Sequence, residues 1–439
     1  MHPSAPSRRS LLATAGAVGA ALALGSGTAH ASAGGGSVKL VARPSAESER
    51  LRLVQALRAG AFQPTGRYVP ANTALTFDVR AHDGLVPTLW IGQWDYYGTV
   101  KAPREYPLTP GTNTVTDPYG GPVYFSLAGD GERATVRFRS GDSAMPVFVL
   151  GRTDESAYQK QLDTLTDIPF VELRGPRSIV TLSRDGALLY RDEDHAALLR
   201  LYERIIQAEN DISGLDGSAP VHRPKAGGFH FTEVPVVPSG VGAYATHGYN
   251  GFPRAYLDRA TTVQGLLTRG WGLYHELGHT HQQWAYKPTG LTEVTVNIYS
   301  LAVQRALGQP SNLLNPNSTT GLTPYESALP KLGTSGLAYE TSFGAYEKLV
   351  PLRQLELAFG DSFWPRMHKL VRVEHPESAY TETAKRYRAL ATYSSRAAGY
   401  DLTDFFVNRW AFPIDDQGRT ELAALNLPQP HVDPSTLTE

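Results

Sequence analysis

The sequence predicts an α+β protein of more than one domain, in which an N-terminal β-sandwich-like domain is followed by a mostly helical domain. The chain of 439 residues is long enough for roughly two or three domains. From about residue 65 to 155, short runs of alternating apolar and polar residues are separated by clusters of Gly, Pro, Asn and Asp, which is typical of strands joined by turns. Beyond Gly265, the apolar residues recur at helical spacing instead.

The composition excludes several classes of site. Hydrophobic residues make up 41% of the chain and charged residues 19%, which is typical of a soluble globular protein. The formal net charge of -1 provides no strong field that would attract nucleic acid or an acidic membrane. Because the chain contains no cysteine, it has no disulfide framework, no cysteine zinc site and no thiol nucleophile. Any metal site must therefore use His and carboxylate ligands.

The N-terminal 31 residues have the features of a twin-arginine signal peptide. Residues 7–12 (Ser-Arg-Arg-Ser-Leu-Leu) form the twin-arginine pattern, an apolar run extends over 11–24, and Ala29-His30-Ala31 offers a cleavage site. The apolar run is too short for a good membrane span, although a short anchor is the alternative. We therefore expect a secreted, extracellular protein that is exported by the twin-arginine route and has no stable membrane span.

The next two segments are predicted to be a linker with a short helix, over residues 32–64, and the β-sandwich-like domain, over 65–155. The linker begins with Ser-Ala-Gly-Gly-Gly-Ser, and apolar spacing favours a helix within 46–60. Alternating runs such as 74–79 and 134–138 supply the expected strands.

The rest of the chain, residues 156–439, is predicted to be a second, mostly helical domain. Residues 179–182 have the composition of a strand, and 194–210 have the spacing of an amphipathic helix. Further helices are expected near residues 266–286, 292–307, 351–373 and 380–398.

The motif that indicates chemistry is His275-Glu276-Leu277-Gly278-His279, which has the pattern H-E-x-x-H. A helix brings residues i and i+4 to one face, so His275 and His279 can reach the same zinc ion. Glu276 can then take a proton from zinc-bound water. Glu293, 14 residues after His279, is the expected third ligand, and Asn297 follows it at i+4, where it can hold a ligand in place by a hydrogen bond.

Two alternatives concern the histidines. His275 and His279 could be an ordinary pair on a helix surface, but the apolar residues around the motif and the downstream Glu293 favour a metal site. His281 is a possible ligand by type. Since it lies two residues after His279, it should point away from the metal, and we expect it to be exposed or to support a ligand.

The similarity extends beyond the motif, to residues 270–279 (Gly-Trp-Gly-Leu-Tyr-His-Glu-Leu-Gly-His), Gln283, Trp284 and residues 293–300 (Glu-Val-Thr-Val-Asn-Ile-Tyr-Ser). These residues resemble the enhancin-like family of mucin-degrading zinc metallopeptidases. Weaker similarity at residues 65–71, 120–124 and 398–406 extends the resemblance over about residues 60–415. The resemblance implies that residues 156–439 form a metallopeptidase catalytic domain of the gluzincin type, with His, His and Glu on zinc, and that the substrates are proteins with O-linked glycans.

Together these observations predict a secreted zinc-dependent endopeptidase that cleaves O-glycosylated, mucin-type proteins, with one Zn²⁺ per chain. His275, His279 and Glu293 are the predicted ligands, and Glu276 is the predicted catalytic residue that activates zinc-bound water. One alternative is a general secreted metalloprotease without glycan dependence. Another is a glycan-binding protein with an inactive metal site, but Glu276 argues against it because a binding module needs no general base.

Three residues of a Gly-rich loop before the motif are candidates for substrate contact, namely Tyr244, His247 and Tyr249. Such a loop could border the cleft and either stabilise an oxyanion or contact a sugar. Ordinary loop packing is the equally good alternative.

Two further features have both a functional and an ordinary interpretation. Trp90, Trp94, Tyr96 and Tyr97 could stack on sugars, but we favour packing in the sandwich core and at a domain interface. Arg396 could bind a substrate carboxylate or a sialic acid, but we favour an exposed position on a helix.

Overall fold

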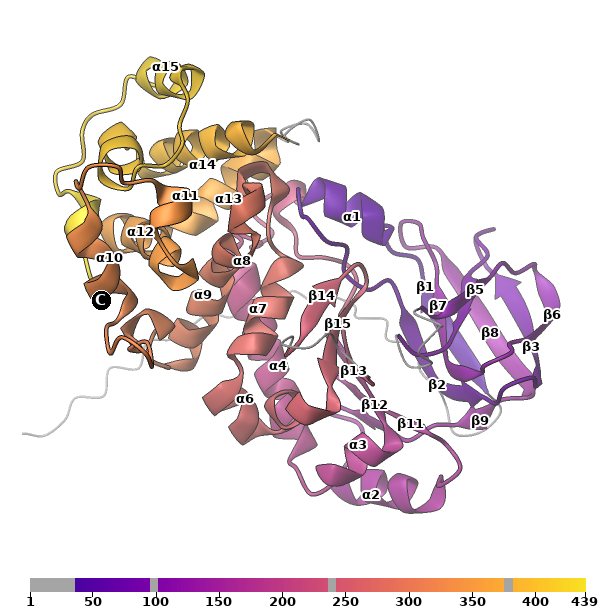
Figure 1. The fold of residues 1–439 in the computed structure, drawn as a ribbon. Coiled ribbons are helices and arrows are strands. Elements are labelled where there is room, and N and C mark those ends of the chain that lie inside the picture. Colours follow the sequence, from indigo (N-terminus) through magenta and orange to yellow (C-terminus); the bar gives the residue numbers. More distant parts are fainter. Residues whose placement is uncertain (1–35, 95–101, 236–241, 375–381) are drawn as a thin grey trace, which may run out of the picture.

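The computed structural model describes residues 36–94, 102–235, 242–374 and 382–439 (Figure 1). These residues form sheets of four, five and six strands, followed by a helical region. Figure 1 shows an elongated molecule with the two smaller sheets at one end, the helices of the C-terminal part at the other, and the six-stranded sheet between them. The twin-arginine pattern and its cleavage site lie outside the described residues.

The N-terminal part is a β-sandwich, and the α+β fold class predicted from the sequence is confirmed. Its strands pair in antiparallel fashion, and alternate residues such as Leu75, Phe77 and Val79 are buried between the two sheets. One sheet has the order β1 (Ser37–Val41), β8 (Arg133–Ser140), β3 (Ala74–Ala81) and β6 (Gly111–Thr116), and the other has the order β5 (Arg104–Tyr106), β4 (Thr88–Ile91), β7 (Gly121–Ser126), β2 (Gln63–Val69) and β9 (Ser143–Ala144).

The segment before the sandwich differs from the expected linker. Residues Ser37–Val41 form strand β1, which pairs with β8 and buries Val38 and Leu40 in the sandwich core. Because these two apolar residues alternate with polar ones, one side of the strand faces the core once the segment pairs with β8. The short helix α1 (Ala46–Arg52) follows and ends well before residue 60.

A mixed sheet of six strands lies in the middle of the described structure. Its order is β10 (Val147–Val149), β11 (Phe170–Arg174), β12 (Ser178–Ser183), β13 (Phe229–Val234), β15 (Tyr249–Pro253) and β14 (Tyr244–Thr246). Strands β12, β13 and β15 run parallel, whereas β14 is antiparallel to β15 and forms one edge. This edge strand contacts helix α7 (Trp271–His279), which carries the H-E-x-x-H motif.

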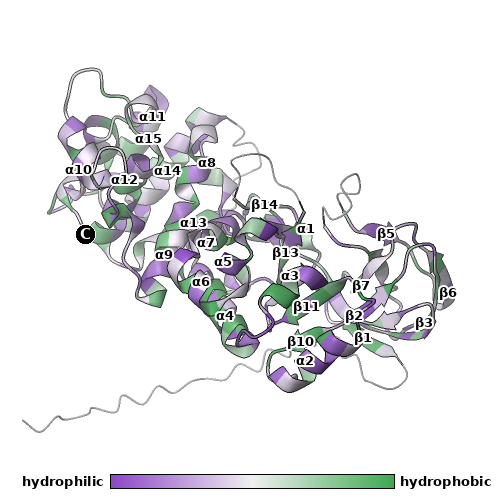
Figure 2. Cartoon of the chain, turned by 60° about the horizontal axis from the view of Figure 1, so that its bottom comes forward, coloured by the Kyte–Doolittle hydropathy of each residue, from purple (hydrophilic) through white to green (hydrophobic). Residues whose placement is uncertain are grey.

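Three helices lie in the connections between strands of this sheet, namely α2 (Glu155–Thr164) between β10 and β11, and α3 (Arg184–Leu189) and α4 (His195–Ile212) between β12 and β13. Helix α4 corresponds to the amphipathic helix predicted at 194–210, and it buries Leu198, Tyr202 and Ile205. Figure 2 shows both hydrophobic and hydrophilic residues on α4, as expected for a helix with one face in a core.

The C-terminal part is helical and has its own core, in which Trp364, Tyr387 and Trp410 are among the buried side chains. Its first predicted helix, residues 266–286, is divided into α6 and α7, and α7 ends where the Thr280 hydroxyl donates to the Leu277 carbonyl oxygen at 2.6 Å. The helices are α5 (Asp258–Thr261), α6 (Val263–Arg269), α7 (Trp271–His279), α8 (Thr292–Thr295), α9 (Asn297–Leu307), α10 (Pro324–Ala328), α11 (Tyr339–Ser342), α12 (Ala345–Phe359), α13 (Phe363–Glu374), α14 (Thr383–Ala398) and α15 (Asp416–Ala424).

Aromatic rings fill the junction between the sandwich and the mixed sheet. The ring of Phe62 stacks on Tyr124 at 4.8 Å and on Trp94 at 5.7 Å, and Trp94 stacks on Tyr249 of β15 at 4.5 Å. Trp90 packs against the same Phe62 ring. The described tryptophans of the aromatic patch therefore pack at this junction, whereas residues 96 and 97 lie outside the described residues.

A chain of buried hydrogen bonds crosses the same junction. The Tyr124 hydroxyl of β7 donates to Glu172 at 2.6 Å and lies 3.2 Å from the Thr181 hydroxyl. His230 lies 2.8 Å from Thr181 through Nε2, and its Nδ1 accepts from the Trp94 indole at 3.3 Å. Burial lowers the pKa of His230 to about 3, so the imidazole is neutral and Nε2 is the donor to Thr181.

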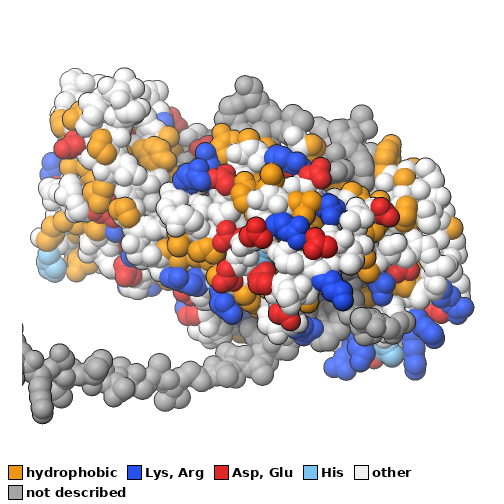
Figure 3. Space-filling model, turned by 90° about the horizontal axis from the view of Figure 1, so that it is seen from below, with side chains coloured by type: hydrophobic (Ala, Val, Ile, Leu, Met, Phe, Trp, Pro, Cys, Tyr) orange, Lys and Arg blue, Asp and Glu red, His pale blue; other side chains and the backbone are white. Residues whose placement is uncertain are grey.

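The surface carries charges of both signs. On the face in Figure 3, acidic and basic side chains are interspersed, in keeping with the net charge of -1. None of the helices in the described ranges has the length and apolar character needed to cross a membrane.

Candidate metal centre

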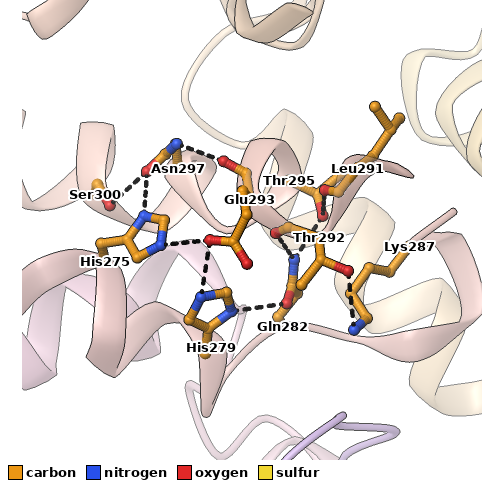
Figure 4. Close-up of polar contacts among 10 residues, drawn as sticks. All are labelled: His275, His279, Gln282, Lys287, Leu291, Thr292, Glu293, Thr295, Asn297 and Ser300. Atoms are coloured by element: carbon orange, nitrogen blue, oxygen red, sulfur yellow. Dashed lines mark hydrogen bonds and ion pairs between the residues drawn. The ribbon is translucent and has the colours of Figure 1, made fainter. Parts of the chain in front are cut away.

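The motif helix α7 presents His275 and His279 on one side, with their ring centroids 4.7 Å apart. Both imidazoles face the carboxylate of Glu293, whose Oε2 lies 2.9 Å from His275 Nε2 and 3.5 Å from His279 Nε2 (Figure 4). One ligand atom from each of the three residues lies within 4.8 Å of the other two. The structure thus brings the three predicted ligands together.

Glu293 reaches the imidazoles because the chain turns back after α7. The turn at Trp284–Tyr286 is buried in the helical core and anchors the loop, and α8 then brings Glu293 beside His275 and His279 of the motif helix. Hydrogen bonds from His275 and His279 hold the pKa of the Glu293 carboxyl well below its usual range. The group is therefore an ionised carboxylate, as metal ligation requires.

Asn297 orients the first imidazole. Its Oδ1 lies 2.8 Å from His275 Nδ1, its Nδ2 donates to the Glu293 carbonyl oxygen at 2.9 Å, and the Ser300 hydroxyl donates to Oδ1 at 3.3 Å. Burial alone would lower the pKa of His275, but the contacts with Glu293, Glu276 and Asn297 outweigh it and raise this pKa. With Nδ1 as the donor to Asn297, Nε2 is directed at the metal position.

Gln282 orients the second imidazole, and the sequence did not identify it. Its Oε1 lies 3.2 Å from His279 Nδ1, while its Nε2 donates to the Thr292 carbonyl oxygen at 2.8 Å and to the Thr295 hydroxyl at 2.7 Å. Gln282 therefore connects α7 to α8, the helix of the third ligand. The only signal in the sequence is its position three residues after His279; in the structure it lies in the turn after α7.

Glu276 is buried beside the metal position, with 8% of the residue exposed. Burial raises the pKa of its carboxyl, and the charges of His275 and His279 offset part of this increase. The backbone of Ala245, in the edge strand β14, also hydrogen-bonds to Glu276. The candidate base thus lies beside both the metal position and β14, which is an edge of the sheet among the described strands.

The residues present fit a zinc ion. Ligand atoms about 2.0–2.1 Å from a tetrahedral zinc are about 3.3 Å apart, and the observed separations of 2.9 and 3.5 Å lie on either side of this value. Two imidazole nitrogens and one carboxylate oxygen are a donor set that zinc accepts in catalytic sites, where three protein ligands leave one position open. The Glu293 side chain is 68% exposed, so solvent and substrate can reach this side of the site.

His281 lies away from the metal position, but it is neither exposed nor in contact with a ligand side chain. It is buried, with its Nδ1 at 2.9 Å from Oε2 of Glu209 and its Nε2 at 3.2 Å from Asn210. Its expected exposure was wrong because the turn after α7 directs the ring into the space between α4 and α7 rather than into solvent.

The three loop residues have different surroundings. Tyr244 and Tyr249 lie on the paired strands β14 and β15, with their hydroxyl oxygens 3.2 Å apart. His247 lies in the turn between them, where its Nδ1 accepts from the Arg58 backbone N–H at 3.1 Å. This contact ties His247 to the segment after α1 rather than to the metal cluster.

A pocket of about 360 Å³ opens beside the metal cluster. His275 and Glu276 line one part of it, and Phe252, Arg259 and Trp271 line others. The pocket therefore adjoins both a candidate ligand and the candidate base, where a group next to a reacting bond would lie.

Comparison with known proteins supports the likeness seen in the motif. Residues 141–411 match the family model of Peptidase M60, enhancin and enhancin-like proteins, and residues 44–138 match the model of the N-terminal domain of M60-like peptidases. A TRPM8 channel-associated factor homolog from Xenopus laevis is 24% identical over 383 residues, which are 83% of this chain and 40% of that protein. The chain spans less than half the length of the curated relatives that it matches.

Solved structures share the fold over most of the chain. A conserved protein of unknown function from Bacillus anthracis is 28% identical, with a TM-score of 0.81 over 92% of this chain and 81% of that chain. The M60 catalytic domain of ZmpC from Clostridium perfringens, in complex with the sialyl T antigen, is 18% identical, with a TM-score of 0.75 over 92% of this chain and 82% of that one. The second likeness is one of fold alone.

Proposed function

This chain belongs to the M60 family of enhancin and enhancin-like peptidases, and we propose that it is a secreted zinc-dependent endopeptidase that cleaves O-glycosylated, mucin-type proteins. The observation that carries the proposal is the convergence of His275, His279 and Glu293, with Glu276 beside them. A site with three ligands and an adjacent buried carboxyl has the parts needed for hydrolysis rather than for structural metal binding.

The proposed chemistry assigns a separate task to each side chain. A zinc ion held by His275, His279 and Glu293 would supply Lewis acidity for the scissile carbonyl and lower the pKa of the attacking water. Asn297 and Gln282 hold the two imidazoles through their Nδ1 atoms. With the rings held in these orientations, the Nε2 atoms of both imidazoles are directed at the same metal position.

Glu276 is the proposed general base. Its carboxylate takes a proton from the attacking water and then passes this proton to the leaving amine. Burial raises the pKa of this carboxyl toward neutral pH. A group whose pKa is near the working pH can both accept a proton and return it. A glycan-binding protein with an inactive site would have no use for this group.

The edge strand β14 supports a peptide as the substrate. It pairs with β15 on one side only, so among the described strands its other side is open to an added extended chain. Its Ala245 contacts Glu276, so a peptide along this edge would pass the metal position. We propose that Tyr244 contacts this peptide, since it lies on the same strand.

Glycan dependence rests on a weaker observation, namely the sialyl T antigen bound to the ZmpC catalytic domain, which shares this fold. The general metalloprotease therefore stays as the alternative. Export by the twin-arginine route rests on residues 1–31 alone, and N-terminal sequencing of the secreted protein should find a chain that begins near Ser32.

The decisive experiment is a digestion of one mucin-type glycoprotein and of its enzymatically deglycosylated form by the zinc-loaded protein. We expect discrete fragments from the glycosylated form only, and none with the Glu276→Gln variant. Equal cleavage of both forms would establish the general metalloprotease instead. The absence of cleavage of either form, with zinc bound, would overturn the peptidase proposal.

A further inference from the structure

We propose that Arg259 binds a carboxylate of the substrate in the pocket beside the metal cluster. This inference rests on the proposed function and extends it to a preference for acidic substrates. The pocket of about 360 Å³ is lined by Arg259 and by two residues of the motif, His275 and Glu276. A group bound to Arg259 would therefore belong to the part of the substrate next to the scissile bond.

Arg259 lacks the hydrogen-bonded or acidic partner that a half-buried guanidinium usually has among the described residues around it. Among the described residues, no hydrogen bond or ion pair holds it, and its Nε is buried without a partner. Its guanidinium lies over the ring of Tyr256, with Cζ at 4.2 Å from the ring centroid. A buried donor that lacks an acceptor is destabilising, so a ligand that supplies an acceptor to this guanidinium would remove that cost.

The neighbouring arginine of the pocket shows the contrast. Arg269 also lines the pocket, but it forms an ion pair with Asp258, the residue directly before Arg259. The nearest acidic side chain in the sequence is therefore committed to Arg269, which leaves Arg259 as a positive charge for a ligand. The contact with the Tyr256 ring limits the orientations of the guanidinium, which lowers the conformational entropy that is lost on binding.

The ligand chemistry follows from the shape and lining of the pocket. A guanidinium presents paired N–H donors that match the two oxygens of a carboxylate. Phe252, Leu273 and Trp271 provide apolar walls against which a sugar ring or a methylene chain can pack. Two substrates carry such a carboxylate close to a scissile bond, namely a glycan with sialic acid and a peptide with Asp or Glu.

The test measures binding separately from cleavage. Three synthetic glycopeptides share one Thr that carries GalNAc: the neutral peptide has Asn beside this Thr, the second has Asp in place of the Asn, and the third keeps the Asn but has sialylated GalNAc. Their dissociation constants are measured by calorimetry on the zinc-loaded Glu276→Gln variant, in which turnover is expected to be too slow to interfere. We expect at least one acidic peptide to bind about 10- to 100-fold more tightly than the neutral peptide, as a charged hydrogen bond would give.

Three further substitutions in this background identify the residue responsible. Arg259→Gln should abolish the preference for the acidic peptide, Arg259→Lys should retain part of it, and Arg269→Gln should retain most of it. The second and third peptides show whether the carboxylate comes from the peptide or from the sugar. Equal binding of all three peptides, or a preference that survives Arg259→Gln, would overturn the proposal.

The outcome for Arg259 can be separated from the outcome for the proposed function. If the wild-type protein cleaves none of the three peptides while the acidic preference depends on Arg259, the carboxylate site stands and the peptidase proposal fails. If the wild-type protein cleaves the peptides but the variant binds all three equally, the peptidase proposal stands and the carboxylate site fails. The neutral peptide should be affected little by Arg259→Gln, which shows that the variant is folded.

Discussion

The Nδ1 atom of His275 lies 2.8 Å from Oδ1 of Asn297, and this contact joins the motif helix to the helix that follows Glu293. Asn297 also binds the carbonyl oxygen of Glu293. One amide thus sets the orientation of one predicted ligand and the backbone position of another. The metal position depends on this amide as well as on the three side chains that would contact the ion.

Replacement of Asn297 should therefore weaken zinc binding. Asn297→Ala removes the acceptor for His275 and should lower zinc affinity about 10- to 100-fold, the range typical of partners that orient a ligand. Asn297→Asp keeps an oxygen acceptor and should retain more affinity. Titration against a zinc chelator measures both constants, and an Asn297→Ala variant with wild-type affinity would remove this role.

Replacement of Gln282 should also weaken zinc binding, because Gln282 orients the second imidazole, that of His279. Gln282→Met nearly conserves volume but cannot accept from His279 or donate to Thr292 and Thr295, so we expect about a tenfold or greater loss of zinc affinity. Gln264→Met, at an exposed position on α6, is the matched control and should bind zinc normally. A loss of affinity in both variants would point to a general effect of methionine instead.

Replacement of Glu276 should separate metal binding from catalysis. Glu276→Gln conserves the shape of the side chain but cannot take the proton, so cleavage should fall by roughly 10² to 10⁴ while zinc content stays close to wild type. Zinc content and cleavage are measured on the same preparation. Loss of zinc would make Glu276 a ligand or a structural residue, and unchanged cleavage would exclude it as the base.

Removal of a ligand should abolish stoichiometric zinc and the stability that zinc confers. His279→Ala should contain far less than one zinc per chain by elemental analysis, whereas His82→Ala, at an exposed site in the sandwich, should be fully loaded. At a free zinc concentration about 1,000 times the dissociation constant, binding stabilises the folded state by about 4 kcal/mol. A chelator should therefore lower the melting temperature of the wild type but not that of His279→Ala.

Asp117, in the sandwich, should give a measurable dependence of stability on pH. It is fully buried and accepts from Arg104 at 2.7 Å and from the Tyr106 hydroxyl at 2.7 Å. Burial alone would raise its pKa, but these hydrogen bonds outweigh it and lower the pKa. The stabilisation is therefore complete above the unfolded pKa of about 3.9 and is lost as the pH falls through the folded value.

The corresponding variant, Asp117→Asn, should be less stable than the wild type by about 3 kcal/mol at pH 7, since Arg104 loses a charged partner in a buried site. This difference should stay constant above the unfolded pKa of about 3.9 and decrease at lower pH, because the wild-type carboxyl loses its charge as the pH falls through its lowered folded pKa. Urea denaturation at several pH values measures it. A difference that stays constant with pH would show that the charge of Asp117 contributes nothing.

The sequence predicted the parts of the site that depend on local spacing. His275 and His279 are four residues apart on one helix, and Glu293 and Asn297 begin the next helical stretch, so elementary helix geometry was enough to group them. Gln282 was missed because its role arises from the turn after α7, where the helix ends earlier than the apolar pattern indicated.

The features that depend on contacts distant in sequence were not predictable. β1 was assigned to a linker because its two apolar residues are significant only once β8 lies beside them. Arg396 was considered for a substrate carboxylate, yet it pairs with Glu374, whereas Arg259 has no such partner among the described residues. An arginine that forms an ion pair cannot be distinguished in the sequence from one that does not, because the partner is brought into contact only by the tertiary structure.

The hydrogen-bonded chain from Tyr124 through Thr181 to His230 has a consequence for how such proteins can diverge. Each of its members is buried, and each belongs to a different strand, with Tyr124 on the sandwich and the other two on the mixed sheet. Recombination that exchanged the sandwich for one without a hydroxyl at the position of Tyr124 would remove a buried hydrogen-bond partner of Glu172 and Thr181. The sandwich and the mixed sheet are therefore expected to be inherited together and to unfold as one cooperative unit. Additional domains are more easily accommodated at the exposed ends of the molecule than at this junction.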